Sequence, residues 1–165
     1  IPIEAAMIAY NIAPGLFRNN YAFTDFDNFN KTLWNKLIDN AKNNIILDNN
    51  INIFGSDHIK DNIELAINSA KKIGIENHIQ FSNININNIE VQDSMGTVIL
   101  NPPYGNRLIE NNNIHSLYRT LGDIFKKKFC GYDTYIFSGN FDAIKSVGLR
   151  SKKRIILKMV QLIVD

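Results

Sequence analysis

The sequence is poor in the residue types that build several classes of site. The 165 residues include one cysteine, Cys130, and three histidines. These are too few for a disulfide framework or a zinc cluster. No apolar run approaches the length that crosses a bilayer. We therefore expect no metal and no membrane partner. A lone thiol favours a reducing compartment, the cytoplasm, with an organelle as the alternative.

Charge of either sign is also modest. Eighteen Lys and Arg against sixteen Asp and Glu give a net charge of +2. This balance permits a nucleic-acid partner without arguing for one. The hydrophobic content of 45% is ordinary for a soluble globular protein. A chain of this length suits one domain, which would bury about two thirds of its unfolded surface.

Helical and strand patterns alternate along the chain. Apolar periodicity and end signals predict helices from Pro2 to near Pro14-Gly15 and over residues 30–43, 60–73 with Gly74 as its C-cap, 114–129 and 142–147. Short apolar segments predict strands over residues 51–54, 78–81, 98–100, 135–137, 154–158 and 161–164. The stripe of Leu33, Trp34 and Leu37 is expected in the core. The alternation predicts an α/β fold, with a mostly parallel sheet flanked by helices and ligands at the carboxyl ends of its strands.

Proline is scarce, and two of the four prolines stand side by side in the segment 101–105. They remove two backbone donors and fix two φ angles, and Pro102 holds Asn101 in an extended conformation. We expect the carbonyls of Asn101 and Pro102 to lack ladder partners, with Tyr104 presented on a stiff arm. Free acceptors beside an aromatic ring suit a planar group that carries an exocyclic NH2. The alternative is a structural loop after a strand.

Polar side chains also follow an earlier predicted strand. Asp57 fits the acidic residue that accepts hydrogen bonds from ribose hydroxyls in nucleotide-binding α/β folds. The alternative is an N-cap for the following helix, a position that Asp favours. His58 comes next, either against the face of an adenine or as an ordinary surface histidine.

Six short motifs occur in a fixed order along the chain. They are Glu4-Ala5-Ala6-Met7-Ile8-Ala9, Asn11-Ile12-Ala13-Pro14-Gly15, Gly55-Ser56-Asp57, Asn101-Pro102-Pro103-Tyr104-Gly105 with Arg107-Leu108, Leu117-Tyr118-Arg119 with Leu121-Gly122, and Ser138-Gly139-Asn140. Together they resemble the catalytic domain of the THUMP-associated, S-adenosylmethionine-dependent guanine-N2 methyltransferases of large-subunit ribosomal RNA. The Asn-Pro-Pro-Tyr tetrapeptide is shared by several amino-group methyltransferases, whereas its combination with the other motifs is far more specific.

The resemblance implies a Rossmann-like class I methyltransferase fold, S-adenosyl-L-methionine as cofactor and RNA as partner. It implies catalytic roles for Asn101, Pro102, Pro103 and Tyr104. The Asn101 side-chain oxygen and the Pro102 carbonyl would accept both hydrogens of the guanine N2 amino group. Tyr104 would stack on the extruded base, and Arg107 is the preferred phosphate contact.

The resemblance also implies a cofactor site formed by Asp57, His58, Asn85 and Asn101. Asp57 would bind the ribose, and His58 would lie against the adenine. Asn85 stands four residues past Phe81, where the family often has an Asp that contacts the adenine amino group. An Asn can accept that bond without the charge assistance of a carboxylate.

The sequence departs from the family pattern in two places. The family has a strand, a glycine-rich cofactor loop and a THUMP region before the segment that begins here at Ile1. We therefore expect residues 1–165 to be a single, N-terminally truncated catalytic domain without its first strand. Met159-Val160 stand where the family has an Asn-Gly turn, which puts the last hairpin in question.

Two alternatives stay open. One is a DNA adenine-N6 or protein glutamine methyltransferase that shares the tetrapeptide. The other is an inactive remnant or RNA-binding fragment that cannot hold cofactor. The sequence indicates neither the oligomeric state nor the modified nucleotide.

Overall fold

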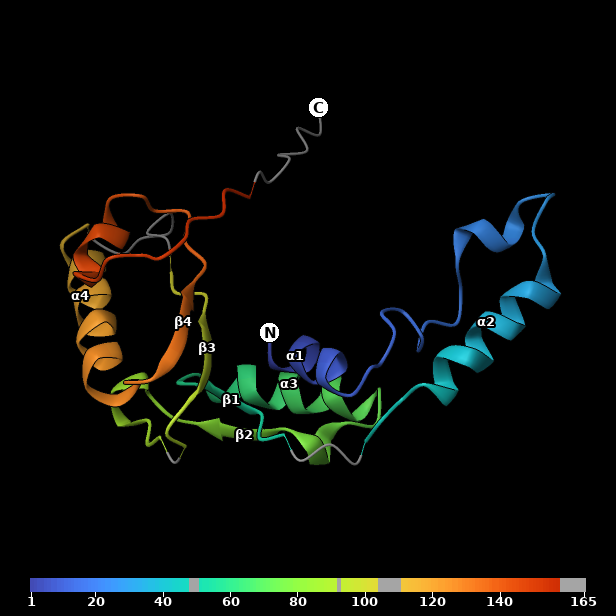
Figure 1. Ribbon diagram of the computed structural model, residues 1–165, viewed down its shortest axis with the longest axis horizontal. Coiled ribbons are helices and arrows are strands. Elements are labelled where there is room, and N and C mark those ends of the chain that lie inside the picture. Colours follow the sequence, from blue (N-terminus) through green and yellow to red (C-terminus); the bar gives the residue numbers. More distant parts are fainter. Residues whose placement is uncertain (48–50, 92, 104–110, 158–165) are drawn as a thin grey trace. The chain divides into compact units, whose positions relative to one another are not determined.

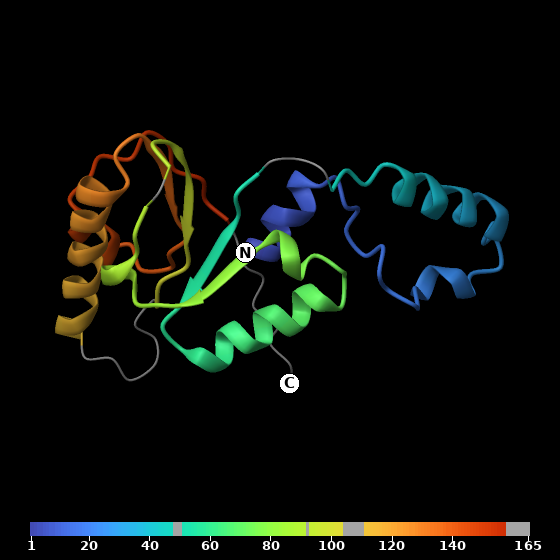
Figure 2. The ribbon, with the colours of Figure 1, turned by 90° about the horizontal axis from the view of Figure 1, so that it is seen from below.

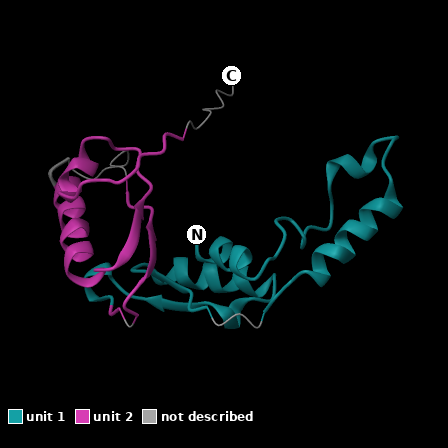
Figure 3. Ribbon diagram, in the orientation of Figure 1, with its two compact units in different colours: residues 1–89 teal, residues 90–165 magenta. Residues whose placement is uncertain are grey.

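The computed structural model describes residues 1–47, 51–91, 93–103 and 111–157. The chain divides into two compact units, residues 1–89 and 90–165 (Figure 3). Each unit is described by itself.

The first unit contains a parallel strand–helix–strand arrangement with further helices (Figure 1). Its elements in chain order are α1 (Pro2–Ala9), η1 (Ala22–Asp25), α2 (Lys31–Asn43), β1 (Phe54–Asp57), α3 (Lys60–Lys71), η2 (Glu76–His78), β2 (Gln80–Asn83) and η3 (Ile86–Asn88). β1 and β2 pair in parallel, with Asp57 opposite Asn83. Parallel neighbours need a crossover, and α3 supplies it, contacting both strands and running alongside them in both views (Figures 1 and 2).

The core of this unit lies between α1, α3 and the segment that leads into β2. Its buried residues are Ala6, Met7, Tyr10, Ile12, Ala70, Ile75 and Ile79. Ile63 and Ala70 on one face of α3 are buried. Gly74 follows the helix with a φ of +72°, as predicted for a residue that ends it.

Helix α1 ends earlier than predicted. Asn11 takes a φ of +54°, and the N–H of Ile12 donates to the Met7 carbonyl at 2.8 Å. This is the pattern of a left-handed helix terminus, which Asn tolerates better than most residues with a Cβ. The helix therefore stops at Ala9, and Pro14 lies well beyond it.

The predicted core role of the α2 stripe is wrong. The helix is capped by Asn30, whose side-chain oxygen accepts the Leu33 N–H at 2.9 Å. None of its residues is buried, and Leu33 and Leu37 are 54% and 52% exposed. Trp34 packs edge-on against Phe23, with ring centroids 4.9 Å apart. Amphipathic spacing predicts that a helix has an apolar face, but it does not show whether other elements pack on that face and bury it.

The second unit repeats the parallel strand–helix–strand arrangement. Its described elements are β3 (Gly96–Leu100), α4 (Asn111–Lys128), β4 (Tyr132–Ile136) and η4 (Ala143–Val147). β3 and β4 pair in parallel in register from Gly96 opposite Tyr132. Buried residues recur along α4 at helical spacing, namely Ile114, Tyr118, Leu121, Ile124 and Phe125. α4 contacts η4 closely, and a Cβ on Gly122 would lie 2.7 Å from the Val147 carbonyl carbon.

The strand predictions are right in kind and shifted in position. β1 begins at Phe54, the last residue of the predicted strand 51–54, and continues through Gly55 to Asp57. The strand requires a small residue at Gly55, because the Cβ of any other residue would lie 3.0 Å from the Phe81 ring. His78 belongs to η2 and not to β2. Short apolar runs show that a strand is near, whereas backbone pairing decides where it starts.

The C-terminal predictions fare less well. Residues 154–157 form no strand, and Ile155 and Ile156 are 68% and 81% exposed. No described strand pairs with this segment. The predicted strand 161–164 and the Met159-Val160 turn lie outside the described residues.

Candidate active site

The proline loop begins where the β3–β4 ladder ends. The N–H of Phe137 donates to the Leu100 carbonyl at 2.8 Å, just past the last strand pair. Asn101 and Pro103 are exposed and Pro102 is half-buried, all without regular secondary structure. Among the described residues, none donates a hydrogen bond to the Pro102 carbonyl.

Tyr118 of α4 ties the far end of this loop to the rest of the unit. Its hydroxyl donates to the Pro103 carbonyl at 3.3 Å and lies 2.7 Å from the Ser138 hydroxyl. Tyr118 is fully buried, so its ring is also part of the core. The loop is thus fixed to a helix as well as to a strand.

Asn140 fixes the position of Ser138 in turn. Its N–H donates to the Ser138 hydroxyl oxygen at 3.1 Å. Its side-chain oxygen accepts the N–H groups of Asp142 and Ala143, at 3.1 and 2.8 Å, at the start of η4. The Ser138-Gly139-Asn140 motif is therefore an ordered turn between β4 and η4.

Asp57 occupies the carboxyl end of β1, as its last residue. Its carboxylate accepts the Ile59 N–H at 2.8 Å and the Asn62 side-chain amide at 3.0 Å. Its backbone carbonyl accepts the Asn83 side chain at 2.9 Å. The residue before α3 is Ile59, so Asp57 orders the strand-to-helix turn without being the helix N-cap.

The surroundings of Asp57 favour its charged form. Partial burial raises the pKa of the carboxyl, but the hydrogen bonds from Ile59 and Asn62, with the nearby His58, outweigh it and hold the pKa below 3.8. The side chain is still 36% exposed. A carboxylate has about four acceptor positions. Asp57 therefore presents an ionised acceptor with capacity for further donors.

Two of the other three predicted cofactor residues, His58 and Asn85, lie near the same end of this strand pair. The His58 ring nitrogen is 3.5 Å from the Asp57 carboxylate, and its side chain is 69% exposed. Asn85 begins η3 two residues past β2, and its side-chain oxygen accepts the Asn87 N–H at 3.0 Å. Asp57, His58 and Asn85 all belong to the first unit, whereas Asn101 belongs to the second. Tyr104 and Arg107 lie outside the described residues.

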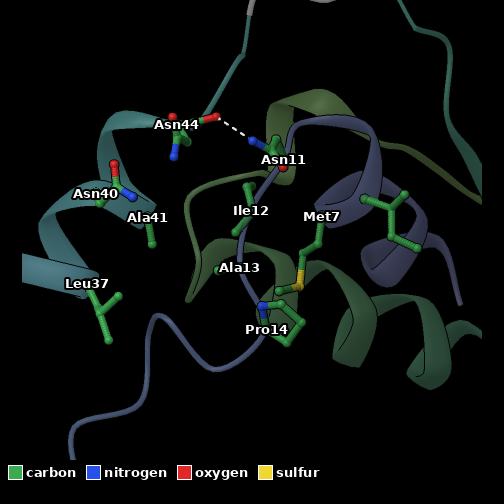
Figure 4. A pocket seen from close by; sticks show the side chains of 10 residues that line it. Met7, Asn11, Ile12, Ala13, Pro14, Leu37, Asn40, Ala41 and Asn44 are labelled. Carbon is green, nitrogen blue, oxygen red and sulfur yellow. Dashed lines mark hydrogen bonds between the residues drawn. The ribbon is translucent and has the colours of Figure 1, made fainter. Parts of the chain in front are cut away.

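A cavity of about 490 Å³ lies elsewhere in the first unit, between the ends of α1 and α2 (Figure 4). It is lined by Met7, Pro14 and Leu37 among others, and the Asn11 side chain donates to the Asn44 carbonyl across its rim at 2.9 Å. None of the predicted site residues lines it. We assign it no role in the site.

Two further classes of site receive no support from the described residues. No helix among them is both long and apolar enough to cross a membrane. In the same part of the chain, no three His, Cys, Asp or Glu side chains gather in a way that could hold a metal ion.

The sequence matches the profile of the RMKL-like methyltransferase domain over residues 1–164. The chain belongs to this family. The resemblance inferred from the motifs is therefore confirmed at the level of the family. A ribosomal RNA large subunit methyltransferase K/L from Shewanella oneidensis is 34% identical over 155 residues, which is 92% of this chain and 22% of that protein. The chain thus spans under a quarter of the length of this relative.

Solved structures agree on the fold of the RMKL-like domain. SMU.472, assigned as a methyltransferase and solved complexed with SAH, matches with a TM-score of 0.83 and 28% identity over 92% of this chain and 40% of its own. A predicted N6-adenine-specific DNA methylase from Listeria monocytogenes matches with a TM-score of 0.82 and 31% identity, over 93% of this chain and 40% of its own. The predicted fold class, an α/β class I methyltransferase with parallel strands, is confirmed.

Sequence reasoning on the RMKL-like domain missed several residues that shape the site. Tyr118 and Ser138 stand in motifs to which the sequence assigns no role, although Tyr118 bonds Pro103 and Ser138 bonds Tyr118. Asn62 and Asn83 were not singled out, although both bond Asp57. The spacing of Asn62, five residues after Asp57 and in the first turn of the predicted helix, is the one signal that points to such a contact.

Proposed function

We propose that this chain is part of the catalytic domain of an S-adenosylmethionine-dependent RNA methyltransferase that modifies the exocyclic N2 amino group of a guanine, in large-subunit ribosomal RNA. The observation that carries the proposal is the proline loop, which presents Asn101 and Pro102 directly beyond a strand whose end is fixed at Leu100. Family membership supports methyl transfer. The name of the Shewanella relative supports ribosomal RNA as the substrate.

The residues at the end of β1 suit the cofactor. Asp57 is ionised, half-exposed and held in place by two hydrogen bonds, so it can accept ribose hydroxyls without rearranging. His58 and Asn85 would contact the adenine. When bound, S-adenosylmethionine supplies a methyl group on a sulfonium, whose bonding electrons stay with the sulfur. The bound SAH of the structural neighbour SMU.472 supports this choice of cofactor.

The proline loop would prepare the amino group for attack. An aromatic NH2 is flat because its lone pair is delocalised into the ring. Acceptance of both hydrogens by the Asn101 side-chain oxygen and the Pro102 carbonyl favours a pyramidal nitrogen with its lone pair exposed. Tyr104 would stack on the flipped base, for about 1–3 kcal/mol, and Arg107 would contact a phosphate. Most of the rate enhancement would then come from positioning.

The decisive experiment identifies the methylated product. The full-length polypeptide is incubated with labelled S-adenosylmethionine and, in separate reactions, with large-subunit ribosomal RNA, duplex DNA or a glutamine-containing peptide. We expect N2-methylguanosine from RNA alone. N6-methyladenine from DNA would overturn the proposal in favour of the activity for which the Listeria neighbour is named.

A binding measurement separates an active domain from an inactive remnant. Calorimetric titration with S-adenosylhomocysteine is expected to show micromolar binding to the full-length polypeptide. Asp57→Ala should weaken it by at least about tenfold, since a lost hydrogen bond to a charged group is worth about 1.5–3 kcal/mol. Lys71→Ala, at the far end of α3, is the matched control. Absence of binding by a cooperatively folded protein would favour the remnant.

A further inference from the structure

Tyr118 has a hydroxyl in the core of the second unit and uses it on the proline loop. The side chain is 0% exposed. Burying a hydroxyl without a hydrogen-bond partner costs free energy, so a buried tyrosine hydroxyl is expected to have partners. Its partners include the Pro103 carbonyl oxygen and the Ser138 hydroxyl. A purely apolar core position would be filled equally well by phenylalanine.

The number of protons available on the two hydroxyl groups limits which of them donates in this network. Tyr118 has one proton to donate, and the Pro103 carbonyl can only accept. When Tyr118 donates to Pro103, the Ser138 hydroxyl can donate to the Tyr118 oxygen across 2.7 Å, in place of its longer 3.5 Å contact with the Asn140 carbonyl, and it accepts the Asn140 N–H at 3.1 Å. The chain of bonds then runs from Asn140 through Ser138 and Tyr118 to the Pro103 carbonyl.

Hydrogen bonds hold the backbone on both sides of the two proposed acceptors, Asn101 and Pro102. Leu100, on one side of them, is bonded by Phe137, and Pro103, on the other side, is bonded through Tyr118 to Ser138. Two neighbouring residues past β4 thus hold both ends of the loop. The two prolines fix their own φ angles, so little freedom remains between these anchors.

We propose that Tyr118 is a positioning residue, whose hydroxyl sets the orientation of the Asn101 and Pro102 acceptors toward the target amino group by holding the Pro103 carbonyl. This inference rests on the proposed methyl transfer to an amino group. The hydroxyl itself need not touch substrate or cofactor. Its bond to Pro103, at 3.3 Å, is long for an O–H···O contact, and hydrogen bonds of this kind are often longer in a ligand-free site than in the substrate complex.

The test compares two hydroxyl deletions in the full-length polypeptide. Tyr118→Phe keeps the buried ring and removes the bond to Pro103. Tyr132→Phe is the matched control, since its hydroxyl donates to the Asp93 backbone carbonyl at 3.0 Å. We expect Tyr118→Phe to lower kcat by about 10- to 100-fold, the cost of a small misplacement of reacting groups, with KM for RNA and Kd for S-adenosylhomocysteine within about twofold of wild type. The control should retain wild-type kcat.

Rates are expressed per molecule that binds S-adenosylhomocysteine, so that a loss of folded protein does not count as a loss of catalysis. A wild-type kcat per binding-competent molecule in Tyr118→Phe would overturn the proposal. A parallel fall in the rate of Tyr132→Phe would overturn it too. Ser138→Ala removes the second link, and we expect it to lower kcat without adding to the effect of Tyr118→Phe in the double variant.

A second readout keeps this inference separate from the proposed function. Amide hydrogen exchange is followed on a peptide that contains Asn101, in wild type and both tyrosine variants. We expect faster exchange in Tyr118→Phe alone. If wild type methylates no RNA, the proposed function fails. The exchange data then still decide on Tyr118, and unchanged exchange would overturn its positioning role.

Discussion

At the scale of the residue, Asn101 combines an exposed position with a fixed backbone neighbour at Leu100. Asn101→Ala should lower kcat by about a hundredfold or more, as removal of one well-placed hydrogen-bonding group does in other active sites. Cooperative unfolding in urea should remain. Asn113→Ala, an exposed asparagine of α4, is the control and should leave both unchanged. Loss of the unfolding transition in Asn101→Ala would show that the residue is structural.

A second prediction at this scale concerns Asp57 and the stability of the protein at acidic pH. Its pKa lies below 3.8 in the folded protein, so the unfolded chain takes up this proton first as the pH falls. The residue therefore stabilises the fold above that value, and the contribution disappears as the pH falls through the lower folded pKa. Asp57→Asn should flatten this part of the stability profile, measured by urea unfolding at a series of acidic pH values. Identical slopes in variant and wild type would contradict it.

At the scale of the element, the approach of α4 to η4 depends on Gly122. Replacing glycine by alanine inside a helix normally stabilises by about 1 kcal/mol. Here the added Cβ meets the Val147 carbonyl, and overpacking of this kind costs about 1–3 kcal/mol. Gly122→Ala should therefore lower the free energy of unfolding despite its better helix propensity. Urea unfolding checks the sign, and Ser116→Ala, an exposed position of α4, should show no loss.

Helices were easier to predict from the sequence than strands. The start of α3 at Lys60 and its end near Gly74 follow from local periodicity and from a glycine that accepts a positive φ. The start of β1 depends on its partner strand, which lies more than twenty residues away in the chain. α2 shows the other limit. Its apolar stripe predicts a helix correctly, and its exposure depends on what the rest of the unit places against it.

The candidate site divides in the same way. Pro102 and Pro103 fix their own φ angles through their rings, so the sequence alone sets this part of the backbone. The roles of Tyr118 and Ser138 were not, because their bonds join residues 15 to 20 positions apart. A tyrosine at a helical core position predicts burial, and nothing local tells which carbonyl its hydroxyl will reach.

At the scale of the whole molecule, the small net charge conceals an uneven distribution. Basic residues gather in residues 90–165, with Lys126-Lys127-Lys128 at the end of α4 and Arg150, Lys152 and Lys153 beyond η4. The Lys152–Asp133 ion pair is 95% and 65% exposed, so it holds that lysine only weakly. An RNA backbone would be attracted to this unit before any base is recognised.

The unequal charge leads to a test by salt. Replacing Lys152 and Lys153 by alanine should weaken RNA binding and reduce its logarithmic salt dependence by about one to two units, one for each lost phosphate contact. At saturating RNA, kcat should not change. The adjacent lysines Lys71 and Lys72 of the first unit form a matched control pair. An equal effect of both pairs, measured by filter binding over a salt series, would refute a preference for the second unit.

The turn at Ser138-Gly139-Asn140 gives η4 a part in how activity is lost on heating. The Asn140 side chain bonds the N–H groups at the start of η4, and its own N–H bonds Ser138, so we expect fraying of this short 3-10 helix to loosen Ser138, Tyr118 and the proline loop. Such local openings require less free energy than global unfolding. Thermal inactivation should therefore begin below the melting temperature, while the parallel strands are still paired. Cooling from this range should restore the activity within the time of a loop rearrangement.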